Sequence, residues 1–236
     1  MLAFYAHVLN LQKQIDEALR SADVLSGEIA TDCALLRPHL RTLLEVVRDH
    51  APEPLAEEAA DLADASEHER DRLLREFWGD RSDRRFFAKT ILQPYARLLA
   101  SRGLLRNVSA TDDNTRCPHC GGRPQLSIMQ RANEALADGG GRSLLCANCV
   151  TPWRFNRLMC ANCGEGDERR LKYFHAPEYN HLRIDACDVC RHYLKAVDLT
   201  RFGLAAPLVD EAAGAALDVW AREHGYEKIE LNLLGL

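Results

Sequence analysis

Four CxxC pairs constrain the fold of this 236-residue chain more than any other feature of its sequence. They contain eight of the nine cysteines: Cys117/Cys120, Cys146/Cys149, Cys160/Cys163 and Cys187/Cys190. One pair chelates a soft metal ion through two thiolates. A second pair completes a tetrahedral site of four sulfurs, the geometry suited to zinc and to iron. Eight ligands therefore predict two four-cysteine sites and two metal ions, either iron or zinc.

Two other chemistries also use paired cysteines. Four disulfides would suit a small secreted domain, but this chain is longer and begins without the basic region and cleavage site of a secretory signal. A thioredoxin-like redox centre needs one CxxC at a strand-to-helix junction, not four in tandem. Metal binding is therefore the preferred interpretation. Cys33 stands alone in an apolar helical pattern, and we expect a buried core thiol there.

The spacing of the pairs bears on which of them share a metal. Sequential pairing gives two similar units, in which 25 and 23 residues separate the two pairs. In each unit a glycine (Gly121, Gly164) follows the first pair, where a positive φ would turn backbone N–H groups toward the sulfurs. A different residue (Val150, Arg191) follows the second pair. We therefore predict a duplicated module, with cross-braced pairing as the alternative. The predicted ligands are Cys117, Cys120, Cys146 and Cys149 for site 1, and Cys160, Cys163, Cys187 and Cys190 for site 2.

An aromatic residue, Trp153 or Tyr193, also follows the second pair of each unit, where it could shield a metal from water. Short strand-like runs lie between the pairs, bounded by turn residues. They are PQLSIMQ, RSLLC, LKYFHA, HLRIDAC and YLKAV. Zinc ribbons and rubredoxin folds are built in this way, because the metal replaces a hydrophobic core that is too small to fold alone.

The remainder of the chain has helical periodicity. Apolar faces predict helices around Phe4–Leu19, Leu36–Val47, Leu55–Trp78 and Phe86–Leu99, the last capped by Ser82 or Asp83, and a closing helix over Leu208–Gly225. The segment 109–115 is expected to be a linker. The predicted fold class is α+β, with four parts: a helical domain (1–108), two tandem rubredoxin-like or zinc-ribbon modules (109–158 and 159–200) and a C-terminal helical tail (201–236). No stretch is long enough and apolar enough to predict membrane insertion, and we expect a cytoplasmic location, where thiols stay reduced.

Charge and motifs argue against two functional classes, nucleic-acid binding and catalysis. The chain carries 30 Lys and Arg against 35 Asp and Glu, whereas nucleic-acid-binding ribbons usually present a basic face. Two local basic clusters exist, at Arg154/Arg157 and Arg169/Arg170/Lys172. Catalysis has little support, because eight cysteines fill two closed sites and no phosphate loop, nucleophile elbow or HExxH motif is present. We expect the nearby histidines at 119, 175, 181 and 192 to lie on the surface or behind the ligands.

The residues around the cysteines resemble the formate dehydrogenase accessory protein family (FdhE). The resemblance rests on RCPHCGGRPQLSIM (116–129), LLCANCVTPWRFNRLMCANCGEGDERRLKYF (144–174), IDACDVCRHYLKAVDL (184–199) and the C-terminal segment from Leu208. It covers most of the chain and is most specific from about residue 115 onward. Family members carry a further N-terminal segment, which indicates either a late start codon or a shorter branch here.

The resemblance implies a cytoplasmic accessory factor that is not itself an enzyme. Such a factor has two rubredoxin-like modules, each with a metal ion. It contacts the molybdenum-containing catalytic subunit of a respiratory formate dehydrogenase before that subunit is exported. No catalytic residue transfers from the family to this chain. A rubredoxin-like electron carrier and a zinc-ribbon nucleic-acid-binding protein remain the alternatives. The first requires a reversible iron couple, and the second requires binding that weakens steeply with salt.

Overall fold

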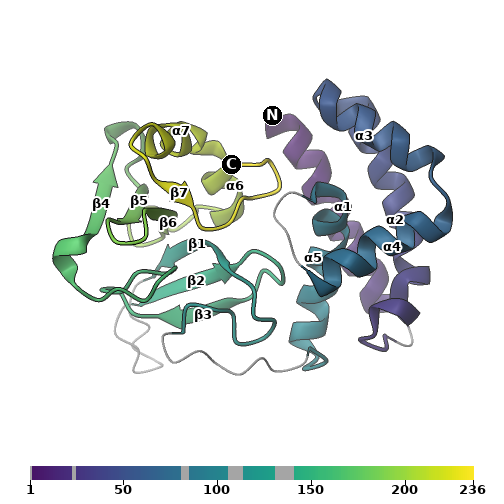
Figure 1. Cartoon of the computed structure of the whole chain (residues 1–236), viewed down its shortest axis with the longest axis horizontal. Helices are drawn as coiled ribbons and strands as arrows, with labels where there is room; N and C mark the ends of the chain where they lie inside the picture. The colour runs from purple at the N-terminus through teal and green to yellow at the C-terminus, as the bar shows by residue number, and fades with distance from the viewer. Residues whose placement is uncertain (1, 23–24, 81–84, 106–113, 131–140) are drawn as a thin grey trace. The chain divides into compact units, whose positions relative to one another are not determined.

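The computed structural model describes residues 2–22, 25–80, 85–105, 114–130 and 141–236 (Figure 1). The chain divides into two compact units, one that contains the helices α1 to α5 and one that contains the sheet and the C-terminal helices. The α+β class and the N-terminal helical region are as predicted. The predicted cap at Ser82 or Asp83, the boundary at 108/109 and most of the predicted linker at 109–115 lie outside the described residues. The division into four parts stays a prediction.

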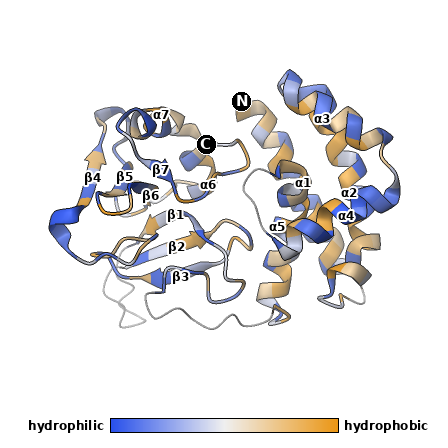
Figure 2. Cartoon of the chain, viewed as in Figure 1, coloured by the Kyte–Doolittle hydropathy of each residue, from blue (hydrophilic) through white to orange (hydrophobic). Residues whose placement is uncertain are grey.

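The first unit consists of five helices, and Figure 2 shows polar and apolar residues on each of them. Their bounds are α1 (Leu2–Ser21), α2 (Ile29–His50), α3 (Glu53–Asp64), α4 (Glu67–Gly79) and α5 (Phe86–Ser101). Apolar residues at helical spacing give each helix one face to bury. The α5 helix is the most buried, and it packs against α1, α2 and α4. The predicted faces of α1, α2 and α5 therefore form the core.

The pattern predicted from Leu55 to Trp78 folds as two helices rather than one. A capping box ends the continuity, because the Ser66 side chain accepts from the Glu69 N–H while the Glu69 carboxylate accepts from the Ser66 N–H at 2.8 Å. The Ser66 hydroxyl also donates to the Glu69 carboxylate at 2.7 Å, and this bond together with that from the Ser66 N–H lowers the pKa of Glu69. The buried end of Asp71 in α4 then receives two hydrogen bonds from Arg37 in α2, at 2.7 and 3.0 Å. Because the helix ends and restarts here, α4 can pack against α2.

The second unit is built on one sheet whose strand order is β3-β2-β1-β6-β5-β4, with β7 beside β6. The strands are β1 (Pro124–Met129), β2 (Arg142–Cys146), β3 (Pro152–Phe155), β4 (Leu171–His175), β5 (Leu182–Cys187), β6 (His192–Asp198) and β7 (Glu227–Lys228). The first three strands and the next three each form an antiparallel meander. A parallel pairing between β1 and β6 joins the two meanders into one sheet.

All five predicted strand runs contain a strand, but β3 and β7 were not predicted. The β3 strand has four residues and begins with Pro152, which suits a strand edge and gives a weak sequence signal. The parallel contact between β1 and β6 joins segments about 70 residues apart, so local patterns do not reveal it. The two modules therefore share one sheet instead of standing as separate ribbons.

The closing helical segment is also two helices, α6 (Pro207–Ala213) and α7 (Ala215–Glu223), with Gly214 between them. A Cβ at Gly214 would lie 2.8 Å from Cδ1 of Leu182 on β5, so glycine lets the chain approach the sheet without displacing this side chain. Among the described residues, no helix combines the length and the apolar character that crossing a membrane requires.

Candidate metal centre

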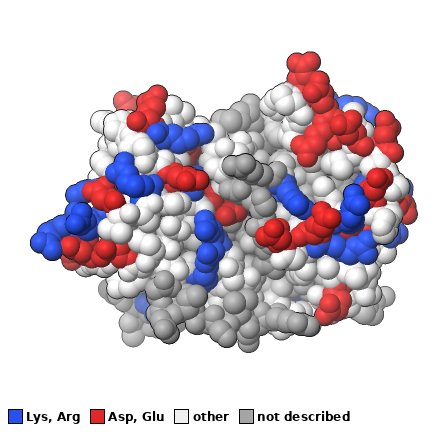
Figure 3. All heavy atoms as spheres, viewed as in Figure 1, with Lys and Arg blue, Asp and Glu red and all other residues white. Residues whose placement is uncertain are grey.

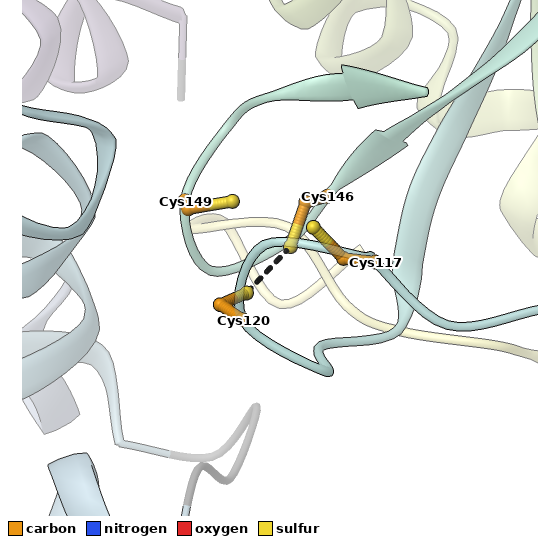
Figure 4. A group of neighbouring side chains, drawn as sticks. All are labelled: Cys117, Cys120, Cys146 and Cys149. Atoms are coloured by element: carbon orange, nitrogen blue, oxygen red, sulfur yellow. Dashed lines mark hydrogen bonds between the residues drawn. The ribbon is translucent and has the colours of Figure 1, made fainter. Parts of the chain in front are cut away.

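The structure brings the eight paired cysteines together as two groups of four, the same two groups that sequential pairing predicts. Within each group the four sulfur atoms lie within 4.8 Å of one another. Figure 4 shows the first group, in which side chains from two turns converge on one point and the sulfurs of Cys120 and Cys146 are 3.4 Å apart. In the second group, the sulfurs are 3.7 Å apart for Cys160 and Cys190 and 3.8 Å apart for Cys163 and Cys187.

The repeat in the sequence is also a repeat in the fold. In each meander one pair precedes the first strand, and the other pair begins at the last residue of the second strand and ends in the turn before the third. All four turns contain a residue of positive φ directly after the second cysteine: Gly121 (70°), Val150 (52°), Gly164 (74°) and Arg191 (57°). The two glycines were predicted to adopt this conformation. Val150 and Arg191 adopt it without glycine, which strains both residues, and a β-branched side chain such as valine most of all.

The left-handed residue turns the next backbone N–H toward a sulfur. In the second group the N–H of Glu165, which follows Gly164, donates to the Cys163 sulfur, and the N–H of His192, which follows Arg191, donates to the Cys190 sulfur. The Asn162 N–H donates to the Cys160 sulfur at 3.4 Å. Hydrogen bonds of this kind stabilise thiolates, the form in which cysteine binds a metal.

Burial and hydrogen bonding act on these thiols in opposite directions. Burial raises the pKa of the Cys160 thiol well above its ordinary value and that of Cys163 to about 11. For Cys190 burial also raises the pKa, but hydrogen bonds from Asn162 and the His192 N–H outweigh it and lower the pKa to about 7. A bound divalent ion favours deprotonation of all four ligands, so metal binding and proton release are coupled here.

The donor set fits a tetrahedral metal ion. A zinc–sulfur bond of about 2.3 Å implies about 3.8 Å between sulfurs in a regular tetrahedron, close to the separations in the second group. The same four thiolates suit iron equally well. Each group can therefore hold a metal ion, and with four protein ligands such a site has no open position for substrate.

The nearby histidines lie outside both groups of sulfurs. His181 contacts Asp210 at 2.8 Å through Nε2, and His192 contacts the carbonyl oxygen of Cys190 at 2.7 Å through Nδ1. Cys33 is 2% exposed on α2 and belongs to neither group, as predicted, and burial raises the pKa of its thiol. The described residues therefore offer only cysteines as ligands at the two centres.

The two aromatic residues predicted to shield metals are both buried, and each has a polar partner. Trp153 Nε1 donates to the carbonyl oxygen of Asn114 at 3.0 Å, which ties β3 to the segment before the first pair. The Tyr193 hydroxyl donates to Asp218 on α7 at 2.8 Å, and burial raises the pKa of this phenol. Tyr193 thus joins the sheet to a C-terminal helix, a role that its position after a CxxC pair did not suggest.

A buried arginine that sequence reasoning missed links the modules. Arg142 on β2 is 4% exposed, and its Nη1 donates to the carbonyl oxygen of Met159, directly before Cys160, at 2.9 Å. Its Nη2 lies 3.1 Å from Asp185 on β5. The signal available was a charged residue within the apolar run RSLLC, which is unusual in a buried strand.

Two of the three cations in the basic cluster at 169–172 pair with acidic neighbours. Arg169 pairs with Asp167 at 2.9 Å, and Lys172 lies 3.6 Å from Asp188. Figure 3 shows Lys and Arg side by side with Asp and Glu in this part of the surface, at the start of β4, and acidic side chains over α3. Paired charges of this kind do not form a continuous phosphate track.

Comparisons with known proteins agree with this architecture. Residues 158–234 match the family model "FdhE, C-terminal domain". The FdhE homolog of Aquifex aeolicus is 32% identical over 196 residues, which cover 82% of this chain and 68% of that protein. The FdhE homolog of Haemophilus influenzae strain PittGG is 27% identical over 223 residues, 92% of this chain and 72% of that protein.

A solved structure shares the fold. The crystal structure of the FdhE protein from Pseudomonas aeruginosa superimposes with a TM-score of 0.66, covering 97% of this chain and 86% of that chain at 22% sequence identity. At this identity the match shows the fold alone, whereas the Aquifex aeolicus relative shows the family. Since the similarity extends over most of both sequences and the structure holds two converging groups of cysteines, the chain belongs to the FdhE family.

Proposed function

We propose that this chain is a cytoplasmic accessory factor, not an enzyme, that supports the maturation of a respiratory formate dehydrogenase. It binds the immature molybdenum-containing catalytic subunit, and it holds two metal ions, iron or zinc. The ligands are Cys117, Cys120, Cys146 and Cys149 in site 1, and Cys160, Cys163, Cys187 and Cys190 in site 2. The observation that carries the proposal is the pair of closed four-cysteine groups within a chain of the FdhE family.

Closed sites suit a structural or electron-carrying metal rather than a catalytic one. Four cysteine ligands leave no position for a substrate, and in the second group backbone N–H groups and the Asn162 side chain support the thiolates. The metals would fix the four turns, and with them the shared sheet, as a rigid surface for the client. An electron-carrying role needs iron in the sites, so the nature of the metal separates these two functions.

Anaerobic co-purification tests the proposal. The tagged chain is isolated from its host, the metal content of the same sample is measured, and the bound proteins are identified. We expect two metal ions per chain and the formate dehydrogenase catalytic subunit. Cys117→Ser and Cys160→Ser should each lose one metal ion, whereas the matched control Cys33→Ala should keep both.

Each outcome has a separate meaning. Fewer than two metal ions in the wild-type chain would contradict the assignment of the ligands. Two metal ions with bound RNA or DNA in place of the dehydrogenase subunit would contradict the client and favour a nucleic-acid-binding protein. Two iron ions with a reversible couple and no captured subunit would favour the electron carrier.

A further inference from the structure

In both groups the four sulfur atoms lie within 4.8 Å of one another, but the second CxxC turns are supported differently. Val150 and Arg191 occupy equivalent places and have similar positive φ values of 52° and 57°. Valine offers only an apolar side chain. Arg191 extends from its turn to the residues that end α7, where its guanidinium makes several polar contacts.

The contacts of Arg191 form a defined cluster. Its Nη2 donates to the carbonyl oxygen of His224 at 2.6 Å, and its Nε donates to that of Gly225 at 3.2 Å. The guanidinium carbon lies 4.0 Å from the centre of the Tyr226 ring, within range of a cation–π interaction. Its Nη1 reaches Asp188, inside the same CxxC turn, at 3.3 Å. One side chain thus contacts both the turn and the end of the helix.

Residues that follow α7 also donate hydrogen bonds to the CxxC turn. The Tyr226 hydroxyl donates to Asp188 at 2.6 Å, and the Glu227 N–H donates to the carbonyl oxygen of Arg191 at 2.8 Å. Gly225 has a φ of +75°, and a Cβ there would lie 3.1 Å from the Nη2 of Arg191. Glycine at 225 therefore permits the close approach that the guanidinium needs.

The consequence concerns the metal. The left-handed conformation of Arg191 directs the His192 N–H to the Cys190 sulfur, and the contacts with 224–227 hold Arg191 in that conformation. From this geometry we propose that Arg191 is a positioning residue for site 2, through which metal binding at site 2 and docking of the C-terminal segment 215–229 stabilise each other. The proposal rests on the proposed metal binding. Since coupling is reciprocal, loss of the site 2 metal weakens the attachment of the helix end, and release of the helix end weakens metal binding.

Glycine substitutions separate the side chain from the backbone. Arg191→Gly removes the side-chain contacts with residues 224–226 but relieves the strain of positive φ, and Val150→Gly relieves the same strain in site 1. Zinc-loaded proteins are challenged anaerobically with a chelator, and native mass spectrometry follows the loss of each ion. Alkylation of the freed cysteines, followed by peptide mapping, identifies the site. We expect Arg191→Gly to release the site 2 ion about 10–100-fold faster, the usual effect of removing support behind the ligands, with site 1 unchanged. Val150→Gly should release neither ion faster.

A second pair of variants changes the C-terminal segment instead of the CxxC turn. Gly225→Ala should also accelerate release from site 2, whereas Gly235→Ala, at a similar φ of 74° with no heavy atom within 4 Å of the new Cβ, should not. Hydrogen exchange gives the reciprocal readout. Cys160→Ser, which lacks the site 2 ion, should lose protection at residues 224–229, whereas Cys117→Ser, which lacks the site 1 ion, should keep it.

Three results would overturn the inference: wild-type release rates in Arg191→Gly, equal acceleration at both sites, or equal protection of 224–229 in Cys160→Ser and Cys117→Ser. Equal acceleration would show general loosening of the fold. Failure of the wild-type chain to bind two ions would instead contradict the proposed metal binding, before the role of Arg191 is reached.

Discussion

Replacement of Lys195 by methionine tests the most unusual feature of the sheet unit, a buried cluster of four charges. Lys195 on β6 and Lys228 on β7 meet Glu211 on α6 and Asp218 on α7, and all four side chains are at most 2% exposed. Lys195 lies 3.1 Å from Glu211, and Lys228 lies 3.3 Å from Asp218. The other two pairs, Lys195 with Asp218 and Lys228 with Glu211, are in direct contact.

The expected magnitude follows from the charge balance. Two cations and two anions sum to zero, and burial alone would raise the pKa of Glu211, but Lys228 and Lys195 lower it, so this carboxyl group stays ionised. Lys195→Met leaves one uncompensated negative charge in a buried site. Breaking a buried ion pair in this way costs about 3–5 kcal/mol. Because total stabilities are about 5–15 kcal/mol, the loss is a large share of the free energy of unfolding.

Urea unfolding of the metal-loaded protein, followed by circular dichroism, measures this loss. Lys13→Met is the matched control, since Lys13 and Glu17 form an exposed pair with side chains 76% and 64% accessible, and we expect no measurable change. The double variant Lys195→Met/Asp218→Asn restores neutrality and should lose less than the sum of the two single variants. A loss below about 1 kcal/mol for Lys195→Met would refute the reasoning, because the cluster would then tolerate an unpaired charge.

Four further predictions concern other parts of the chain. Arg142→Met should lower the free energy of unfolding by about 2 kcal/mol in urea, because a charged hydrogen bond to the Met159 carbonyl and an ion pair with Asp185 are lost. Hydrogen bonds from Arg37 hold the pKa of Asp71 below its usual value, so this stabilisation is present above about pH 4 and lost as the pH falls further. Asp71→Asn should therefore flatten the acid limb of a melting-temperature profile. Ser66→Ala removes the cap of α4 and should cost about 1 kcal/mol in thermal unfolding. Anaerobic removal of the metals should abolish the strand signal in circular dichroism while the signal of helices α1 to α5 persists.

The parts of this structure that local chemistry determines could be predicted from the sequence. The ligand groups follow from spacing, and the positive φ of Gly121 and Gly164 follows from the need to aim N–H groups at sulfur. The division between α3 and α4 could also have been predicted, since Ser66 and Glu69 form a recognisable capping box. Apolar residues at helical spacing lie on both sides of Ser66, so periodicity alone predicts a single helix.

Other features depend on contacts between distant segments. Val150 and Arg191 have side chains that oppose a positive φ, so propensity argues against the conformation that the turn imposes. We predicted that Tyr193 shields a metal from water, but its hydroxyl donates to Asp218, 25 residues away in the sequence. The parallel pairing of β1 and β6 joins the two meanders, and no local pattern of hydrophobicity encodes such a contact.

The two repeats belong to one sheet, but the contacts that support their second CxxC turns differ. The two groups of sulfurs occupy equivalent turns, so the geometry of coordination is fixed by the repeat itself. The C-terminal helices, however, occur once. They attach to β6 of the second meander through Lys195 and Tyr193, and they reach its CxxC turn through Arg191. Through Arg191 the single appended segment makes contacts with the site 2 turn that Val150 cannot make in site 1, so ions bound at the two sites are expected to differ in exchange rate although each site has four cysteine ligands.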